Sequence, residues 1–299
     1  MEKLPVLEVR GLRKSFQDFE AVKGVDFTVY QGDIFGFLGP NGAGKSTTLR
    51  MVTSLINPSS GDIRIFGLPL STNREHILSR MGILVEKPDL YGFLSGYENL
   101  GMLSSLNGKR ASRQRIDEVI HMVGLQGREQ DKVRKYSQGM RQRLGIAQAL
   151  IHDPEIIILD EPSNGLDPQG IVDIRELIIR LGRDFKKTVI LSSHLLNEVE
   201  MMANRMVIIN KGQVIVEGDV QELLGGSTIK VTLSCNRPEE ALAIASEITS
   251  DAHLVDAQLV LEIPREAVAK LVSKLVSNQI EVHAVVPVRK LEDYFISLT

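Results

Sequence analysis

A glycine-rich loop followed by a lysine and two hydroxyl side chains lies near the beginning of the chain. The stretch "FLGPNGAGKST" fits the pattern G-x-x-x-x-G-K-[ST], from Gly39 to Ser46. Glycines let successive backbone N–H groups turn inward around phosphate oxygens. Lys45 would reach the β- and γ-phosphates of a nucleotide, and the Ser46 hydroxyl would ligate Mg²⁺. A glycine-rich turn that matches by chance is the alternative, but the strand before the loop and the helix after it favour a phosphate loop.

Two adjacent acidic residues follow a short apolar strand later in the sequence. The stretch "EIIILDEP" ends its apolar run with Asp160 and Glu161. An acid at a strand end beside a phosphate loop supplies the oxygen ligand that Mg²⁺ needs. We expect Asp160 to hold the ion, partly through water, and Glu161 to polarise the attacking water as a general base. Taken alone, the pair could equally be a solvated strand end.

A third candidate site is the beginning of an amphipathic helix in "VRKYSQGMRQRLGIAQALIHDP". Its first turn has no acidic residue, and four basic side chains flank it: Arg134, Lys135, Arg141 and Arg143. The N–H groups and the dipole at a helix N-terminus favour an anion there. Ser137 could instead cap an ordinary helix, and the two roles are compatible.

Composition limits the class of protein. The 299 residues have a net charge of −3 and 43% hydrophobic residues, which suits one large domain with a small one. Without a basic excess, we expect no nucleic-acid partner. The single cysteine, Cys235, favours a reducing compartment. We find no secretory signal and no apolar window near the roughly 18–20 residues of a membrane span, so another chain would have to cross any membrane.

The elements that must position these motifs alternate between helices and buried strands. A buried strand "IFGFLG" precedes a helix from Lys45 to about Ile56, and residues 95–150 are mainly helical. The strands "EIIIL" and "KTVILSSH" flank the helix "IVDIRELIIRLGRD", which predicts an α/β domain with a largely parallel sheet. The pattern changes at "LLGGST", so we predict two domains, residues 1–223 and a small α+β domain at 224–299 that ends in a helix "KLEDYFISL".

The order of these motifs resembles that of the ATP-binding subunits of ABC transporters over residues 4 to about 223. "YSQGM", residues 136–140, lies where that family has its LSGGQ signature loop. "NGLD", ending at Asp167, resembles its D-loop, and "SSH", ending at His194, resembles its switch histidine. Phe16 stands where the family stacks an aromatic ring on adenine. Several motifs in the family's order are more specific than any one of them.

The resemblance implies a P-loop NTPase domain of the ABC type, with a parallel core sheet, an antiparallel β subdomain and a helical subdomain. It implies that two such domains close head to tail over two ATP–Mg²⁺, so that the signature loop contacts the γ-phosphate on the partner chain. The implied catalytic residues are Lys45, Glu161 and His194. The nucleotide would be bound by Phe16, Gly39, Asn41, Gly42, Ala43, Gly44, Lys45, Ser46, Thr47, Ser137, Gly139 and Asp167. Mg²⁺ would be bound by Ser46, Glu86 and Asp160.

Three parts of the chain depart from the family pattern. Glu86 stands where the family has its Q-loop glutamine, and a full negative charge there is attracted by Mg²⁺ but repelled by the γ-phosphate. It is either a working substitute ligand, which we favour, or a change that weakens the site. Gln138 and Met140 replace a glycine and a glutamine of the signature, and Asn164-Gly165 replaces Ser-Ala in the D-loop. These changes affect our expectation of rate more than of function.

The stretch "VEKP..Y..L...ENL" and the C-terminal "LEDYFISLT" resemble the branch that exports bacitracin and lantibiotic peptides. This implies an ATPase that energises peptide, antibiotic or drug export through separate integral membrane subunits. It would be cytoplasmic and peripheral to the inner face of the cell membrane, paired with a second copy or a relative. Residues 87–97 would meet the membrane subunit, because "PDLYGFL" is apolar and aromatic for a loop. Packing on the chain's own helices is the alternative for this loop.

Two other classes are weighed against transport. The first is a soluble ABC-type ATPase that acts on ribosomes or DNA. The single ATPase domain and the lack of sustained heptads between Lys45 and Asp160 argue against it. The second is a nucleotide-sensing regulatory subunit without turnover, for which Glu86 is the one indication. Intact Glu161 and His194 argue against that class.

Overall fold

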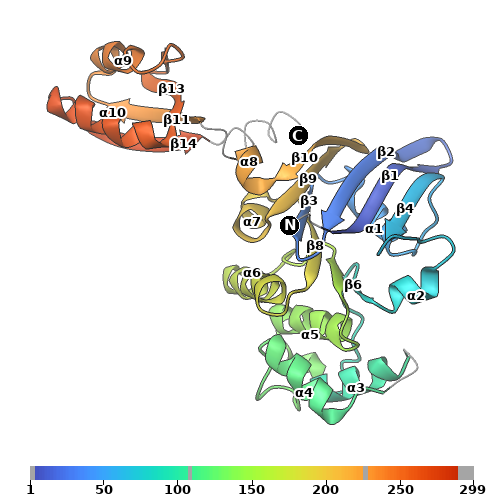
Figure 1. The fold of residues 1–299 in the computed structure, drawn as a ribbon. Coiled ribbons are helices and arrows are strands. Elements are labelled where there is room, and N and C mark those ends of the chain that lie inside the picture. Colours follow the sequence, from blue (N-terminus) through green and yellow to red (C-terminus); the bar gives the residue numbers. More distant parts are fainter. Residues whose placement is uncertain (1–3, 107–109, 225–227, 289–299) are drawn as a thin grey trace. The chain divides into compact units, whose positions relative to one another are not determined.

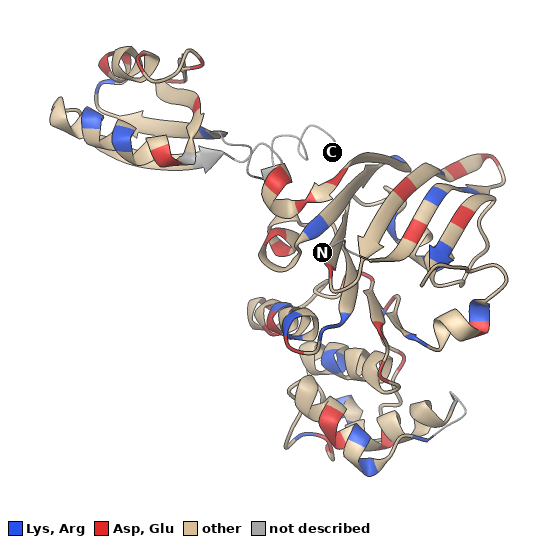
Figure 2. Ribbon diagram, viewed as in Figure 1, with Lys and Arg blue, Asp and Glu red and all other residues tan. Residues whose placement is uncertain are grey.

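The chain folds into two compact units, Met1–Gly218 and Asp219–Thr299. The computed structural model describes residues 4–106, 110–224 and 228–288 (Figure 1). Within these ranges, no helix has the length and apolar character that crossing a bilayer requires. Acidic and basic positions are interspersed along the elements of both units (Figure 2).

The centre of the first unit is a sheet of β3 (Ile34–Leu38), β6 (Met81–Leu84), β7 (Ile156–Leu159), β8 (Thr188–Ser193), β9 (Arg205–Asn210) and β10 (Gln213–Asp219). The order is β10-β9-β3-β8-β7-β6, and the strands from β9 to β6 run parallel. Every residue of β3, β7 and β8 is buried, because other elements cover both faces of the sheet. Continuous apolar runs are the sequence pattern of such strands.

A second, antiparallel sheet consists of β1 (Pro5–Phe16), β2 (Phe19–Tyr30), β4 (Ser60–Ile65) and β5 (Leu68–Pro69), in the order β2-β1-β4-β5. It faces the central sheet across a core that also contains helix α1 (Lys45–Val52) (Figure 1). Phe35 and Phe37 of β3 point into this core, whereas Gly36 between them faces Val199 on the other side. The strand that leads into the glycine loop is therefore held from both faces.

Helix α1 is shorter than the sequence predicts. We expect it to reach about Ile56, but it ends at Val52, so this expectation is wrong by about one turn. Ser54 adopts a φ of 56°, and the N–H groups of Leu55 and Ile56 donate back to the Arg50 carbonyl. These bonds satisfy a carbonyl of the last turn and lead the chain away from the helix axis.

The remaining described helices of this unit are α2 (Arg74–Leu78), α3 (Gly96–Leu106), α4 (Arg113–Met122), η1 (Val133–Lys135), α5 (Gln138–Leu150), α6 (Pro168–Arg183) and α7 (Leu196–Met202). Helices α6 and α7 pack on β3 and β8, and α3 and α4 pack on α5 as a helical group (Figure 1). Ser95 and Glu98 form a capping box at α3, in which each side chain accepts the other residue's backbone N–H. The Ser95 N–H, together with Lys132, lowers the pKa of Glu98.

The second unit is a small α+β fold of α8 (Val220–Leu224), β11 (Thr228–Cys235), α9 (Pro238–Ser246), β12 (His253–Val255), β13 (Gln258–Pro264), α10 (Arg265–Ser277) and β14 (Val282–Val288). Its antiparallel sheet has the order β12-β13-β11-β14, which is the split β-α-β arrangement of ferredoxin-like folds. Leu233, Leu261 and Leu271 lie in its core. The unit begins a few residues before our boundary at 224, and the helix expected at "KLEDYFISL" lies outside the described residues.

Gly36 is a position where the fold leaves no room for a side chain. A Cβ atom there would lie 2.2 Å from Cγ1 of Val199 on α7. We expect Gly36→Ala to lower the free energy of unfolding by about 1–3 kcal/mol, because the helix must move off the sheet. Scanning calorimetry measures the change, with Gly101→Ala as the control because a Cβ there makes only ordinary contacts. An unchanged melting temperature for Gly36→Ala would contradict this packing.

Candidate active site

The topology gathers the candidate residues at one edge of the central sheet. β3, β8, β7 and β6 are parallel neighbours, so their carboxyl ends lie side by side. The glycine loop follows β3, His194 follows β8, and Asp160 with Glu161 follows β7. Glu86 follows shortly after the end of β6. Motifs that are far apart in the sequence therefore meet at this edge.

Close approaches of the backbone shape the glycine loop. A Cβ on Gly39 would lie 2.3 Å from the Ile209 carbonyl oxygen, and one on Gly44 would lie 2.8 Å from the Ala21 carbonyl oxygen. Gly42 and Gly44 also have φ angles of 80° and 104°, which residues with side chains rarely adopt. Gly44 is the N-cap of α1, whose first turn has no acidic residue. The loop thus ends at a helix N-terminus suited to binding phosphate.

The other expected residues of this loop differ in exposure. Asn41 is exposed, whereas Ala43 is buried and donates its N–H to the Pro40 carbonyl (3.1 Å). Ser46 and Thr47 are half-buried in the first turn of α1. The hydroxyl groups of these two residues therefore come directly after the loop lysine.

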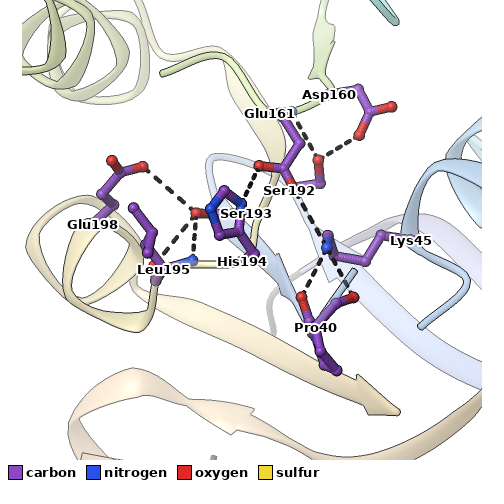
Figure 3. A network of polar contacts seen from close by, with 10 residues as sticks. Pro40, Lys45, Asp160, Glu161, Ser192, Ser193, His194, Leu195 and Glu198 are labelled. Carbon is purple, nitrogen blue, oxygen red and sulfur yellow. Dashed lines mark hydrogen bonds and ion pairs between the residues drawn. The ribbon is translucent and has the colours of Figure 1, made fainter. Parts of the chain in front are cut away.

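Lys45 is buried, and nearby oxygens match its charge. Its side chain is 5% exposed and donates to the carbonyl oxygens of Gly39 (2.7 Å) and Pro40 (3.2 Å). Its Nζ lies 3.2 Å from Oε1 of Glu161, and Oε2 of Glu161 lies 2.7 Å from Nδ1 of His194 (Figure 3). A buried charge requires such pairing. The Glu161 carboxylate therefore connects the loop cation to the histidine.

The backbone at Glu161 adopts a conformation that is uncommon for a non-glycine residue, with φ of 49°. Its N–H donates to Oγ of Ser192 (2.8 Å), and that hydroxyl donates to Oδ1 of Asp160 (2.5 Å) (Figure 3). The Asn164 N–H closes the turn by donating to the Glu161 carbonyl (3.1 Å). The Glu161 carboxylate consequently contacts Lys45 and His194, whereas the Asp160 carboxylate accepts the hydrogen bond of Ser192.

The donors at this edge fit a hard cation such as Mg²⁺. Ser46 offers a hydroxyl and Asp160 a carboxylate, both of them oxygen donors. Within the described residues, no three His, Cys, Asp or Glu side chains cluster as a metal site. The protein oxygens would therefore complete a shell made mainly of phosphate and water oxygens, as Mg²⁺ prefers.

Glu86, the acid in place of the Q-loop glutamine, forms an ion pair with the helix that follows the glycine loop. Its Oε1 lies 2.5 Å from the Arg50 guanidinium, and 66% of its side chain is exposed. Its φ is 76°, again uncommon outside glycine. Because exposed ion pairs contribute little free energy, Arg50 would release this carboxylate readily to a stronger cation.

Phe16 and Asp167 occupy the outer parts of the site. Phe16, at the end of β1, is 47% exposed, and Nζ of Lys14 lies 5.0 Å from its ring centroid. One face of such a ring is available for stacking. Asp167 is the N-cap of α6, where its Oδ1 accepts the Gly170 N–H (3.0 Å). The structure therefore gives Asp167 a capping role within its own chain.

The helix at "YSQGM" begins with Ser137 as its N-cap. The Ser137 Oγ accepts the N–H of Met140 (3.2 Å), and Gly139 is half-buried in the first turn. Tyr136 anchors the loop before it, because its hydroxyl donates to the Arg128 carbonyl (2.7 Å). Burial raises the pKa of the Tyr136 phenol. The hydrogen bond of Tyr136 thus fixes the loop directly before the exposed Ser137.

The four basic side chains near this helix do not all serve its N-terminus. Arg143 turns away, donating to the Gly124 carbonyl (3.0 Å) and lying 3.9 Å from Asp173. The other three are exposed around the helix start: Arg134, Lys135 and Arg141. The expectation of four flanking cations is therefore wrong for Arg143, which connects α5 to α6.

Two departures from the family pattern lie against each other. Nε2 of Gln138 is 2.9 Å from the position that a Cβ would take on Gly165. Gly165 has a φ of 75°, so a side chain there would also strain the backbone. The glycine in "NGLD" therefore leaves room for the glutamine in "YSQGM".

Known proteins that are similar in sequence and fold identify the family. Residues 22–164 match the family model described as ABC transporter. YhcH of Bacillus subtilis, an uncharacterized ABC transporter ATP-binding protein, is 40% identical over 98% of this chain and 96% of its own length. The chain belongs to the family of ABC transporter ATP-binding proteins. As an ABC ATPase it binds and hydrolyses ATP, and it has the family's P-loop NTPase fold.

Two further relatives extend this assignment. The bacitracin transport ATP-binding protein BcrA of Bacillus licheniformis is 45% identical and covers 71% of this ABC ATPase and 69% of its own length. The structure of cbiO1 from Clostridium perfringens, part of the ABC transporter complex cbiONQ, is similar with a TM-score of 0.67. It is 28% identical and covers 74% of this chain and 90% of its own.

Sequence reasoning missed the residues that connect the motifs of the ABC ATPase. Ser192 bonds both acids, Arg50 pairs with Glu86, and Gly165 accommodates Gln138. The signal for Ser192 was a hydroxyl that follows the apolar run "VIL" near the end of a buried strand. Arg50 gave no such signal, and Gly165 was noted only as a departure in the D-loop, because its contact with Gln138 joins two different elements.

Gly39 offers a test of the glycine loop that is independent of backbone strain. A Cβ at Gly39 would meet the Ile209 carbonyl at 2.3 Å, so Gly39→Ala must displace the loop from β9. We expect a loss of about tenfold or more in affinity for a fluorescent ATP analogue. Gly101→Ala, outside the loop, should bind as the wild type does. Wild-type affinity in Gly39→Ala would show that this close approach does not shape the loop.

Proposed function

We propose that this ABC ATPase energises export of a peptide, antibiotic or drug-like substrate through separate membrane subunits. Two ATPase chains, either two copies or this chain and a relative, would close head to tail over two ATP–Mg²⁺. The observation that supports ATP hydrolysis by this site is the chain of contacts from Lys45 through Glu161 to His194. A nucleotide sensor without hydrolysis would not need a carboxylate held between a phosphate-loop lysine and a histidine.

In the proposed reaction, the γ-phosphate of ATP displaces Oε1 of Glu161 from Lys45. The phosphate oxygens give the buried lysine a new counter-charge, so the carboxylate is released without leaving the cation unpaired. His194 retains Oε2 of Glu161 through Nδ1, which leaves Nε2 for contact with the γ-phosphate. Glu161 then accepts a proton from the water whose oxygen attacks the γ-phosphorus, and the bond to ADP breaks.

Mg²⁺, when bound, supplies charge neutralisation at the phosphate oxygens. Ser46 and Asp160 would hold it, and Glu86 would join them on leaving Arg50. Ser137 and Gly139 would bind the γ-phosphate of the partner chain's nucleotide through the start of α5. Phe16 would stack on adenine, and Asp167 would approach the same shared site.

The proposed contact with the membrane subunits is the loop between β6 and α3. Tyr91 and Phe93 in this loop are 45% and 67% exposed, with ring centroids 5.8 Å apart. An exposed aromatic pair on a loop suits a groove for a partner's short helix. The chain would thereby sit on the inner face of the membrane. The substrate class rests on the likeness to BcrA, a bacitracin transport protein.

Glu161→Gln separates binding from hydrolysis. We expect ATP turnover to fall by roughly 10²–10⁴-fold, because the general base is lost while the phosphate loop is unchanged. Light scattering of this variant with Mg²⁺-ATP should show dimers that disappear without nucleotide. Turnover at the wild-type rate would rule out the role assigned to Glu161. ATP binding without a dimer would count against closure by two copies alone.

A second prediction concerns the aromatic pair. Tyr91→Ser with Phe93→Ser should leave the ATPase rate of the isolated chain within about twofold, because both rings lie outside the nucleotide site. The tagged variant should co-purify far less of the membrane subunits than the wild type does. Leu55→Ser, which also removes an exposed apolar side chain (59% exposed), is the control. Undiminished co-purification of the double variant would place the docking surface elsewhere.

A further inference from the structure

We propose, on the basis of the hydrolysis described above, that Ser192 is a positioning residue for both acidic side chains of the site. Its hydroxyl would set the direction of Asp160 and Glu161 at the same time. Nothing in the motif "SSH" assigns it this role, since the histidine is the residue expected to meet the nucleotide.

The first observation is that one hydroxyl bonds both acids. Oγ of Ser192 accepts the N–H of Glu161 at 2.8 Å and donates to Oδ1 of Asp160 at 2.5 Å (Figure 3). A serine hydroxyl has a single proton, so donation to Asp160 leaves its lone pairs for the Glu161 N–H. Ser192 is 0% exposed, so water does not substitute for either bond. It lies on β8, which pairs with the strand of the acids on one side and with the strand of the glycine loop on the other.

The bond to Glu161 holds a backbone that would otherwise relax. Glu161 has a φ of 49°, and this conformation points its carboxylate at Lys45 and His194. Without an acceptor for its N–H, the residue could return to negative φ, and its carboxylate would leave both partners. The bond to Asp160 fixes Oδ1, so that Oδ2 is the oxygen left for coordination of Mg²⁺.

The neighbouring serine provides a matched control. Ser193 is also buried (3% exposed), but its Oγ accepts the Leu195 N–H at 3.0 Å and lies 3.5 Å from Glu198. Successive residues of a strand point to opposite faces, so the two serines have different surroundings. Ser193 bonds neither Asp160 nor Glu161 and supports the turn after β8 instead.

The test compares Ser192→Thr with Ser192→Val in the purified full-length chain. The two side chains have the same shape, but only threonine keeps the hydroxyl. We expect the valine variant to have a kcat roughly 10- to 100-fold below that of the threonine variant, the loss typical of hydrogen bonds to charged groups, with KM for ATP changed less than about threefold. Ser193→Ala should stay within about twofold of the wild type. Equal kcat values for the threonine and valine variants would overturn the proposal, and so would an equal loss in Ser193→Ala.

A second readout distinguishes positioning from loss of stability. In the Glu161→Gln background at saturating Mg²⁺, Ser192→Val should add little further loss of kcat, because its effect through residue 161 is already removed and its effect through Asp160 is masked. It should still raise, several-fold, the Mg²⁺ concentration needed for half-maximal binding of a fluorescent ATP analogue. Additive losses, or an unchanged Mg²⁺ requirement, would overturn the proposal. Absence of ATP hydrolysis by the wild type would instead refute the proposed function itself.

Discussion

The site depends on one requirement, that a lysine buried inside the phosphate loop must have a counter-charge. Glu161 supplies it from the neighbouring part of the sheet, and its second oxygen engages His194. In the proposed reaction, phosphate would displace this carboxylate from the lysine, so nucleotide binding would also release the proposed general base. On this proposal, the pairing of charges would link nucleotide binding to readiness for hydrolysis.

Strand β8 is the element that makes this contact geometry possible. It lies between the strand of the glycine loop and the strand that leads to the acids; it ends in Ser192 and Ser193, and His194 follows it. Its two last buried side chains face different neighbours, one toward the acids and one toward the turn that follows. Gly36 of β3 lies against the Val199 side chain of α7, and Gly39 after it lies against the Ile209 carbonyl of β9, with no space for a Cβ at either position. Close packing at these two glycines thus helps to determine where the charged atoms of the site lie.

The departures from the family pattern are accommodated by other residues in space. Glu86 is balanced by Arg50, and Gln138 lies against Gly165. These two unusual residues are therefore each matched by a neighbour from another element, which supports our reading of them as working variants of the site. The second unit is a ferredoxin-like fold with its own core.

The sequence by itself determined the phosphate loop, the acidic strand end, the parallel α/β sheet and the small α+β unit. These follow from local spacing and from apolar runs, which physical chemistry restricts to a few structures. It also predicted Ser137 as a helix cap, but it extended α1 beyond Ser54, where a positive φ ends the helix. Only the tertiary structure decided that Glu161 bridges Lys45 and His194, that Ser192 bonds both acids, and that Arg143 turns away from the signature helix. Those contacts join residues on different strands and helices, and distances between such residues depend on how the elements pack, which no local pattern encodes.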